Sequence, residues 1–279
     1  MQKISFENVI PWMDGWKEPG DYFNEDGILI CGKCETAKMA FVDVPGLFEH
    51  RPSPRNCKCG QAKAEQEEAE YAKRRALEEI ERLRKQGLTS AQYLESNFSM
   101  DNLHDEKAST ICKRYVEEWE QLKAKNIGLM LHGNYGGGKT FFASCIANAL
   151  LNKGVPVFMT TITDLSLAMK ANFGQDRMPI LERVQKVPLL ILDDVGREET
   201  AFLDYAYDII NTRVKAKKPL IITTNLTMKA IKEETNSRKC RIFDRLVEMC
   251  VPVKVEDAKQ RQEIAKSKYD MLQSILKVN

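Results

Sequence analysis

One glycine-rich segment restricts the fold of this chain more than any other feature. Residues 133–140 read Gly-Asn-Tyr-Gly-Gly-Gly-Lys-Thr and satisfy the pattern G-x-x-x-x-G-K-[ST]. A short apolar run precedes the segment, and residues 141–151 are apolar at helical spacing. Glycines let successive backbone N–H groups point at phosphate oxygens, and a following helix adds its positive end. We therefore expect a phosphate-binding loop between a strand and a helix, rather than a glycine-rich turn that binds nothing.

The residues of this loop have separable roles. Lys139 is expected to neutralise the β- and γ-phosphates of ATP, and the Thr140 hydroxyl is expected to be a Mg²⁺ ligand. The predicted nucleotide-binding set is Gly133, Asn134, Tyr135, Gly136, Gly137, Gly138, Lys139, Thr140 and Phe141.

A second element follows downstream, where the apolar residues 187–192 run into two acids. A wholly apolar strand belongs in the middle of a parallel sheet. Asp193 is expected to hold Mg²⁺, directly or through water, and Asp194 to orient or deprotonate the attacking water. An acid pair after a strand is commonly a helix cap, but its order after Lys139 favours the catalytic interpretation.

Polar and basic residues nearer the C-terminus complete the predicted catalytic set. Asn225 ends the strand 219–225 and is expected to hydrogen-bond the γ-phosphate or the water, although it could instead be a turn residue. Arg241 and Arg245 share one face of a predicted helix. Because phosphoryl transfer needs extra positive charge, often from a neighbouring subunit, Arg245 is the first candidate finger and Arg241 the second. The alternative is a surface helix with salt bridges.

The order of these segments predicts the fold class. Strands at 155–161, 187–192 and 219–225 alternate with helices, and an amphipathic helix at 106–125 precedes the loop. Such alternation predicts an α/β domain in which a parallel sheet is flanked by helices and the ligand lies at the carboxyl ends of the strands.

The cysteines fall into two groups. Four are scattered among apolar residues and are expected to be buried thiols: Cys112, Cys145, Cys240 and Cys250. The other four are clustered as C-x-x-C and C-x-C, and four thiolates suit a structural, tetrahedral Zn²⁺ site: Cys31, Cys34, Cys57 and Cys59. His50 could replace one cysteine, and reduced cysteines without metal are the alternative.

The predicted domains are a zinc-binding domain at 1–60, a linker helix at 61–87 and the ATPase domain at 88–279. Residues 61–86 contain no glycine or proline, and Gly87 is the predicted helix end. Their charges are of mixed sign, so we favour a solvated connector over a partner-binding helix.

Overall charge excludes a globally basic nucleic-acid-binding chain, since 42 basic and 40 acidic residues leave a net charge of +2. DNA contact must then come from local cations near the strand 219–225, for which solvated surface charge is the alternative: Lys215, Lys217, Lys218, Lys229, Lys232, Arg238 and Lys239. Phe173 and Tyr205 are weak candidates for base stacking.

The N-terminus lacks a secretory apolar region, and no run reaches the roughly 18 apolar residues of a membrane span. The expected localisation is cytoplasmic, without membrane contact.

Taken together, the ordered motifs resemble a family. They are similar to those of bacterial and phage helicase loaders of the DnaC/DnaI type and of the related IstB transposase helpers, which are AAA+ ATPases. The segments that carry the resemblance are 129–140, 190–196, 211–213, 218–226 and 241–246, within about residues 95 to 270. The resemblance implies ATP hydrolysis, self-association through the AAA+ domain, and a sensor-1 role for Asn225.

The resemblance also implies partners. The cysteine module looks like the zinc-bearing N-terminal region of such loaders, which docks on a DnaB-type replicative helicase hexamer while the AAA+ domain engages single-stranded DNA. The sequence departs from the family in two respects. Of the family's Gly-x-Ser-x-Arg pattern only Arg261 is kept, so a sensor-2-like role for it is weak. Only 34 residues follow Arg245, too few for a full helical lid.

The alternative functions are an IstB-like transposase helper, typically without a zinc module, and a small-molecule P-loop kinase with a zinc ribbon.

Overall fold

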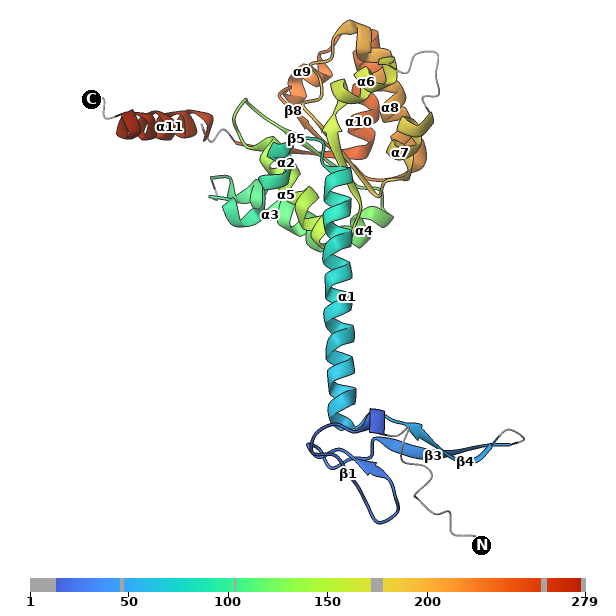
Figure 1. Cartoon of the computed structure of the whole chain (residues 1–279). Coiled ribbons are helices and arrows are strands. Elements are labelled where there is room, and N and C mark those ends of the chain that lie inside the picture. The colour runs from blue at the N-terminus through green and yellow to red at the C-terminus, as the bar shows by residue number, and fades with distance from the viewer. Residues whose placement is uncertain (1–13, 46–47, 103, 172–177, 257–259, 277–279) are drawn as a thin grey trace. The chain divides into compact units, whose positions relative to one another are not determined.

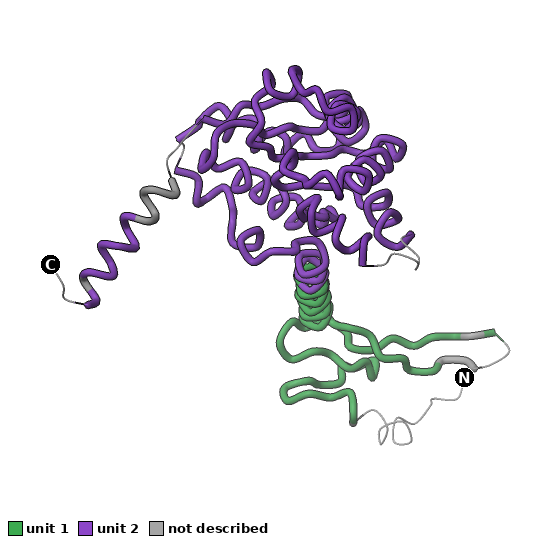
Figure 2. The backbone as a smooth tube through the Cα atoms, turned by 90° about the horizontal axis from the view of Figure 1, so that it is seen from above, with its two compact units in different colours: residues 1–77 green, residues 78–279 purple. Residues whose placement is uncertain are grey.

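The computed structural model describes residues 14–45, 48–102, 104–171, 178–256 and 260–276 (Figure 1). The chain divides into two compact units, residues 1–77 and 78–279 (Figure 2). The helix α1 (Lys58–Gly87) contains the boundary between them. Each unit is described by itself.

Unit 1 is built from short antiparallel pairs. A 3-10 turn, Asp14–Trp16, precedes β1 (Tyr22–Phe23), which pairs with β2 (Leu29–Ile30). β3 (Met39–Val44) pairs with β4 (Phe48–Pro54), with an irregularity in register between Val42 and Val44. Leu29 and Met39 are the buried apolar residues of its core, and Trp16, Ile28 and Phe41 pack against them.

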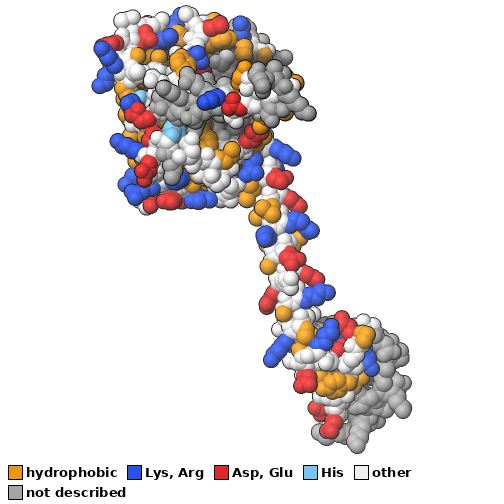
Figure 3. Space-filling model, turned by 90° about the vertical axis from the view of Figure 1, so that its left-hand side faces the viewer, with side chains coloured by type: hydrophobic (Ala, Val, Ile, Leu, Met, Phe, Trp, Pro, Cys, Tyr) orange, Lys and Arg blue, Asp and Glu red, His pale blue; other side chains and the backbone are white. Residues whose placement is uncertain are grey.

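The helix α1 is longer than the predicted 61–86, because it begins inside the second cysteine pair. Residues 61–79 are exposed. Figure 3 shows positive and negative side chains interspersed along it. Near its end, Leu83 packs against the apolar core of unit 2. The exposed part of α1 therefore has the mixed-charge surface of a solvated helix.

Unit 2 contains a five-stranded parallel sheet of order β6-β7-β8-β5-β9. The strands are β5 (Gly128–His132), β6 (Val157–Thr161), β7 (Leu189–Asp193), β8 (Leu220–Thr224) and β9 (Cys250–Lys254). β8 lies between the strand that leads into the glycine-rich loop and the strand that ends in the acid pair. This order confirms the predicted α/β class with a parallel sheet.

Helices cover both faces of the sheet. The first face carries α2 (Ala91–Glu95), α3 (Glu106–Glu117), α4 (Trp119–Ala124) and α5 (Lys139–Asn152). The second carries α6 (Ile162–Ala171), α7 (Met178–Lys186), α8 (Leu203–Ala216), α9 (Met228–Lys232) and α10 (Ser237–Met249). Figure 1 shows the two groups on opposite sides of the strands. Alternation within a strand feeds both cores, since Ile191 belongs to the first and Leu190 and Leu192 to the second.

Single-turn 3-10 segments at Phe98–Met100 and Thr200–Phe202 and the C-terminal helix α11 (Gln260–Leu276) complete the elements described. No helix among the described residues has the length and apolar character needed to cross a membrane.

One local prediction needs correction. The predicted helix 106–125 is interrupted at Glu118, where the chain turns and Trp119 becomes buried. The helix α6 begins at Ile162, and the Thr161 hydroxyl caps its first turn by accepting from Asp164 N at 3.0 Å.

The strand β9 was missed altogether. Its sequence Cys-Val-Pro-Val-Lys contains a central proline, which argues against a strand in the interior of a sheet. It is tolerated here because β9 is an edge strand that pairs only with β5.

Arg213 is a cation in the interior of unit 2. Its side chain is fully buried, and its guanidinium donates to the carbonyl oxygens of Val184, Val187, Pro188 and Pro219 at 2.6–3.1 Å. Burial lowers its pKa to about 9. Arg213 thus satisfies carbonyl groups at the end of α7 and before β8, which explains its place in the motif 211–213 as a structural one.

Candidate nucleotide and metal sites

The glycine-rich loop connects β5 to α5 through left-handed backbone. Gly138, the N-cap of α5, has φ 86°, a value that favours glycine. Gly133 has φ 149°, and a Cβ there would lie 2.3 Å from the carbonyl oxygen of Val255. The missed strand β9 therefore explains why this position needs glycine: the chain leaving it runs directly against the loop.

The two polar residues at the start of α5 are already engaged. Lys139 is buried, and its Nζ donates to the carbonyl oxygens of Gly133 at 3.1 Å and Asn134 at 2.6 Å. The Thr140 hydroxyl donates to Oδ1 of Asp193 at 2.9 Å. The loop and the acid pair, 53 residues apart in sequence, thus meet at one point.

The strand order brings a third residue to this point. Thr223, at the end of β8, donates through its hydroxyl to Oδ1 of Asp193 at 2.6 Å and accepts from the backbone N–H of Asp194 at 2.9 Å. Because β8 lies between β5 and β7, its end lies between the strand that leads into the loop and the strand that ends in the acid pair. A strand in this position brings Asn225 beside the acids.

Asp194 lies in the left-handed region, with φ 58°. Its Oδ1 accepts from Asn225 Nδ2 at 2.9 Å, and its Oδ2 accepts from Arg197 Nη1 at 3.0 Å. Arg197 also lies over the ring of Tyr135, 5.2 Å from the centroid, and its pKa is raised by Asp194. The candidate water-orienting carboxylate is therefore engaged on both oxygens.

These residues surround a cavity of about 520 Å³. The predicted residues that line it are Tyr135, Gly136, Gly138, Lys139, Thr140, Phe141, Asp193, Asp194 and Asn225, whereas Gly133, Asn134 and Gly137 form the loop without lining it. The residues that sequence reasoning missed are Gln92, Tyr93, Ser96, Thr161, Arg197 and Thr223.

Some of the missed residues carried a usable signal. Thr223 lies in the polar end of the same strand as Asn225, and Arg197 follows Asp194 by three residues. Tyr93 carried none, because its hydroxyl reaches Asp193 across 100 residues. Only the tertiary structure shows that contact.

The chemistry of the cavity fits a magnesium nucleotide. Hydroxyl and carboxylate oxygens, the ligands that Mg²⁺ prefers, come together at Thr140 and Asp193. Lys139 and the N-terminus of α5 are the positive groups that would face the phosphates of such a ligand.

The two arginine candidates lie away from this cavity. Both are on α10, and neither is among the residues that line it. Arg241 is exposed, while Arg245 pairs with Glu248 at 2.9 Å, which raises the pKa of Arg245. Within one chain they form part of a charged helix surface. The side chain of Arg261 lies outside the described residues.

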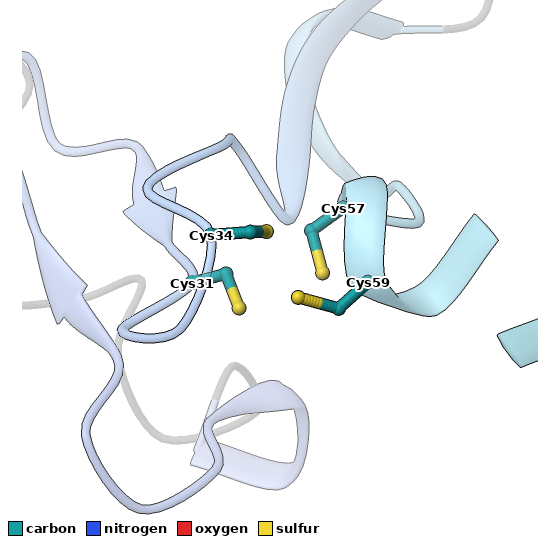
Figure 4. A group of neighbouring side chains, drawn as sticks. All are labelled: Cys31, Cys34, Cys57 and Cys59. Carbon is teal, nitrogen blue, oxygen red and sulfur yellow. The ribbon is translucent and has the colours of Figure 1, made fainter. Parts of the chain in front are cut away.

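The second candidate site is the cysteine cluster of unit 1. The sulfur atoms of Cys31, Cys34, Cys57 and Cys59 all lie within 4.8 Å of one another, and Figure 4 shows them pointing toward a common centre. Zinc–sulfur bonds of about 2.3 Å in a tetrahedron place sulfurs about 3.8 Å apart, so the arrangement fits Zn²⁺. The side chain of His50 lies outside the described residues.

Local structure explains both cysteine spacings. Cys31 and Cys34 lie in the turn after β2, where a Cβ at Gly32 would approach Gly20 O to 2.0 Å. Cys57 precedes the first turn of α1, and its sulfur accepts from Gly60 N at 3.4 Å. The C-x-C spacing therefore reflects a pair that straddles a helix start.

The thiols of Cys34 and Cys59 have pKa values that are shifted in opposite directions. A hydrogen bond between the Thr36 hydroxyl and the Cys34 sulfur lowers the pKa of Cys34 to about 5. A hydrogen bond with Cys34 raises the pKa of Cys59 to about 12. A divalent cation is the species that would stabilise both as thiolates.

Comparison with known proteins agrees with the nucleotide site. The model of a family described as IstB-like ATP binding protein matches residues 64–268. The replicative helicase loader DnaC of Escherichia coli (strain K12) is 29% identical over 163 residues, which are 55% of this chain and 64% of that protein. The replicative helicase loader DnaI of Bacillus subtilis (strain 168) is 23% identical over 150 residues, 49% of this chain and 48% of that protein. The matches thus span less than two thirds of these relatives.

Solved structures show the same fold. A crystal structure of DnaI matches with a TM-score of 0.50 and 27% identity, covering 61% of this chain and 92% of that one. A crystal structure of the DnaC helicase loader matches with a TM-score of 0.51 and 23% identity, covering 60% of this chain and all of that one. Since the family model covers more than half of the chain, the chain belongs to the IstB-like ATP-binding proteins and is an AAA+ protein related to the DnaC and DnaI helicase loaders.

Proposed function

We propose that this protein hydrolyses ATP and assists the loading of a hexameric DnaB-type replicative helicase onto single-stranded DNA. The observation that carries the ATPase part is the meeting of Thr140, Thr223 and Asp193 between the glycine-rich loop and the acid pair. The loader part is supported by the relatives DnaC and DnaI, which are named replicative helicase loaders.

In the proposed reaction each residue acts on the nucleotide from its observed place. Lys139 leaves the two loop carbonyls and neutralises the β- and γ-phosphates, while Thr140 and Asp193 hold Mg²⁺. The metal supplies charge neutralisation of the phosphate oxygens. Asp194 orients the attacking water and can accept its proton.

The contacts of Asp194 hold its carboxylate in place without using all of its acceptor sites. Each oxygen accepts one hydrogen bond, from Asn225 or from Arg197, and keeps a lone pair that can accept from water. Asn225 also lines the cavity, and in the proposed reaction its amide turns toward the γ-phosphate or the water.

Self-association is part of this proposal. Arg245 and Arg241 lie outside the cavity of their own chain, so they can act on a nucleotide only in a neighbouring subunit. We propose Arg245 as the first candidate for that role. Unit 1, with its zinc site, is the proposed helicase-docking module.

One experiment separates the parts of the proposal. The full chain and its Lys139→Ala variant are mixed with a DnaB-type hexamer, and complex stoichiometry is measured by native mass spectrometry with and without ATP. We expect a defined complex with both proteins, an ATP effect only for the wild type, loss of ATP turnover in the variant, and unchanged zinc content. Wild-type turnover in the variant would contradict the site, and the absence of any complex would contradict the loader role.

The second candidate is an IstB-like transposase helper, which the name of the matching family favours. The cysteine cluster favours the loader, because such helpers typically lack a zinc module. The same mixing experiment with a transposase distinguishes the two. The kinase alternative finds no support in the family match, and ATP hydrolysis without an acceptor, stimulated by single-stranded DNA, would exclude it.

A further inference from the structure

Tyr93 contacts the acid pair from an element that no motif includes. Its hydroxyl donates to Oδ2 of Asp193 at 3.1 Å, whereas Oδ1 accepts from Thr140 at 2.9 Å and Thr223 at 2.6 Å. The three donors belong to α2, α5 and β8. The Asp193 carboxylate is therefore held on both oxygens by three separate elements.

The ring of Tyr93 is fixed in place. The residue is 2% exposed. Asn148, on α5, donates through Nδ2 to the carbonyl oxygen of Tyr93 at 2.6 Å and to that of Ser96 at 2.9 Å. The helix that begins with Lys139 thus also anchors α2, so the hydroxyl cannot swing away from Asp193 without moving α2.

The chain leading into α2 is anchored as well. The N–H and hydroxyl of Thr89 donate to Met159 O at 3.3 and 3.1 Å, and Leu88 forms a parallel bridge with Met159 on β6. A Cβ at Gly87 would lie 2.1 Å from Val157 O. The strand β6 pairs with β7, which ends in Asp193. The contacts of residues 87–89 with β6 therefore fix the start of α2, and with it Tyr93, relative to Asp193.

We propose that Tyr93 is a positioning residue for ATP hydrolysis: its hydroxyl fixes the orientation in which the Asp193 carboxylate meets the magnesium nucleotide. The inference rests on the proposed ATPase function. It assigns to α2, outside the loop and the acid pair, a part in metal-dependent nucleotide binding.

The test compares Tyr93→Phe with Tyr115→Phe. Tyr115 is a matched control, since it is buried in the same unit and donates to Ile127 O at 2.8 Å, away from the cavity. Affinity for a fluorescent ADP analogue is measured with Mg²⁺ and with EDTA, alongside thermal unfolding and the Mg²⁺ dependence of hydrolysis. Loss of one charge-assisted hydrogen bond predicts about tenfold weaker binding with Mg²⁺ for Tyr93→Phe, little change with EDTA, and neither change for Tyr115→Phe.

A double-mutant cycle completes the test. In an Asp193→Asn background, Tyr93→Phe should cause no further loss of Mg²⁺-dependent affinity. A folded Tyr93→Phe protein with wild-type Mg²⁺ dependence overturns the inference alone. So does a Tyr93→Phe protein that unfolds while Tyr115→Phe remains folded, because the hydroxyl would then serve stability. A wild-type protein that binds no nucleotide overturns the proposed function and this inference together.

Discussion

The interactions that stabilise unit 1 differ from those that stabilise unit 2. Unit 2 has apolar clusters on both faces of its sheet, whereas the described core of unit 1 centres on Leu29 and Met39. Small domains with few buried apolar side chains commonly need a metal or disulfides to fold. Among the described residues of unit 1, we expect the cysteine cluster and polar contacts to supply this stabilisation.

The polar contacts of unit 1 centre on Asp21. Its carboxylate, with a side chain 3% exposed, pairs with Lys38 at 2.7 Å and accepts from the backbone N–H groups of Glu18 and Gly32. Gly32 lies between the first two cysteines in sequence. The same carboxylate thus fixes the turn that carries half of the metal site.

Removing the metal should have the largest effect and should be confined to unit 1. We expect about one Zn²⁺ per chain, and we expect chelation or Cys34→Ser to unfold unit 1 while unit 2 keeps its ATP affinity and melting temperature. Metal analysis, limited proteolysis and thermal unfolding measure this. Cys240→Ser is the control, because that thiol lies in unit 2 and contacts Glu234 O.

Two outcomes would change this view. Zinc-free protein after purification without chelator would contradict the site. A Cys57→Ser variant that retains metal, beside a His50→Ala variant that loses it, would keep the site but change its ligands.

The reverse experiment acts on unit 2 through Arg213. Arg213→Leu leaves four backbone carbonyls without their donor, and we expect it to lower the free energy of unfolding of unit 2 by about 3 kcal/mol. Zinc content and unit 1 should not change. Arg82→Leu, which removes an exposed arginine paired with Glu79, should leave the free energy of unfolding nearly unchanged, because solvent screens such a pair. Equal losses from the two variants, in denaturant unfolding, would show that the buried guanidinium is not a structural centre.

A smaller effect is expected from the Asp21 ion pair. The Lys38 ammonium and two backbone N–H groups hold the pKa of Asp21 at about 2, below the ordinary value of an aspartate carboxyl. A lowered carboxylate pKa stabilises the fold fully above the unfolded value, and the contribution is lost as pH falls through the folded one. The stability difference between wild type and Asp21→Asn should therefore be constant from about pH 7 to 5 and shrink below about pH 4.

Comparing the two proteins at each pH removes the acid release of metal, which both share. Unfolding of unit 1 is followed by limited proteolysis, and Asp26→Asn, an exposed carboxylate in the same unit, is the control. A difference that grows as pH falls would contradict the assignment.

The difference between the units also bears on what sequence could predict. The strands β5 to β8, the loop and the acid pair were found because apolar runs and motif spacing are local properties. The grouping of the four cysteines of unit 1 was predicted for the same reason, and the structure brings their sulfur atoms together. The packing that supports them was not, because the Asp21–Lys38 pair and the turn at Glu118 depend on tertiary contacts.

Within the nucleotide site the same limit applies. Pro252 made the strand β9 unrecognisable in the sequence, although the chain leaving β9 places Val255 O against Gly133. Tyr93 and Arg197 became visible only when the chain brought them to Asp193 and Asp194. Motifs predicted the groups that would touch phosphate and metal, while the residues that orient those groups required the fold.

The smallest effect expected concerns DNA, and it tests whether binding belongs to unit 2. Lys229 and Lys232 are exposed on α9, and Lys239 is half-buried at the start of α10, just beyond the strand that leads to Asn225. Of the other candidates, Lys218 donates to Lys186 O and Arg238 pairs with Asp204, while Phe173 lies outside the described residues and Tyr205 packs against the core. Lys229 also pairs with Glu233, at 3.9 Å, and both of these side chains are largely exposed. We test Lys229, Lys232 and Lys239 together because they directly follow the strand that leads to Asn225.

Changing Lys229, Lys232 and Lys239 together to Gln should weaken binding to single-stranded DNA severalfold and reduce its salt dependence, because each lost phosphate contact removes a released counterion. ATP affinity should not change. The control removes three exposed lysines of α1, Lys63, Lys73 and Lys85, and so removes the same charge from a different surface. Fluorescence anisotropy across a salt titration measures both variants. If the two lose affinity equally, binding reflects net charge alone; if only the α1 variant loses it, the DNA path follows α1, and the lysines near Asn225 are ordinary solvated charge.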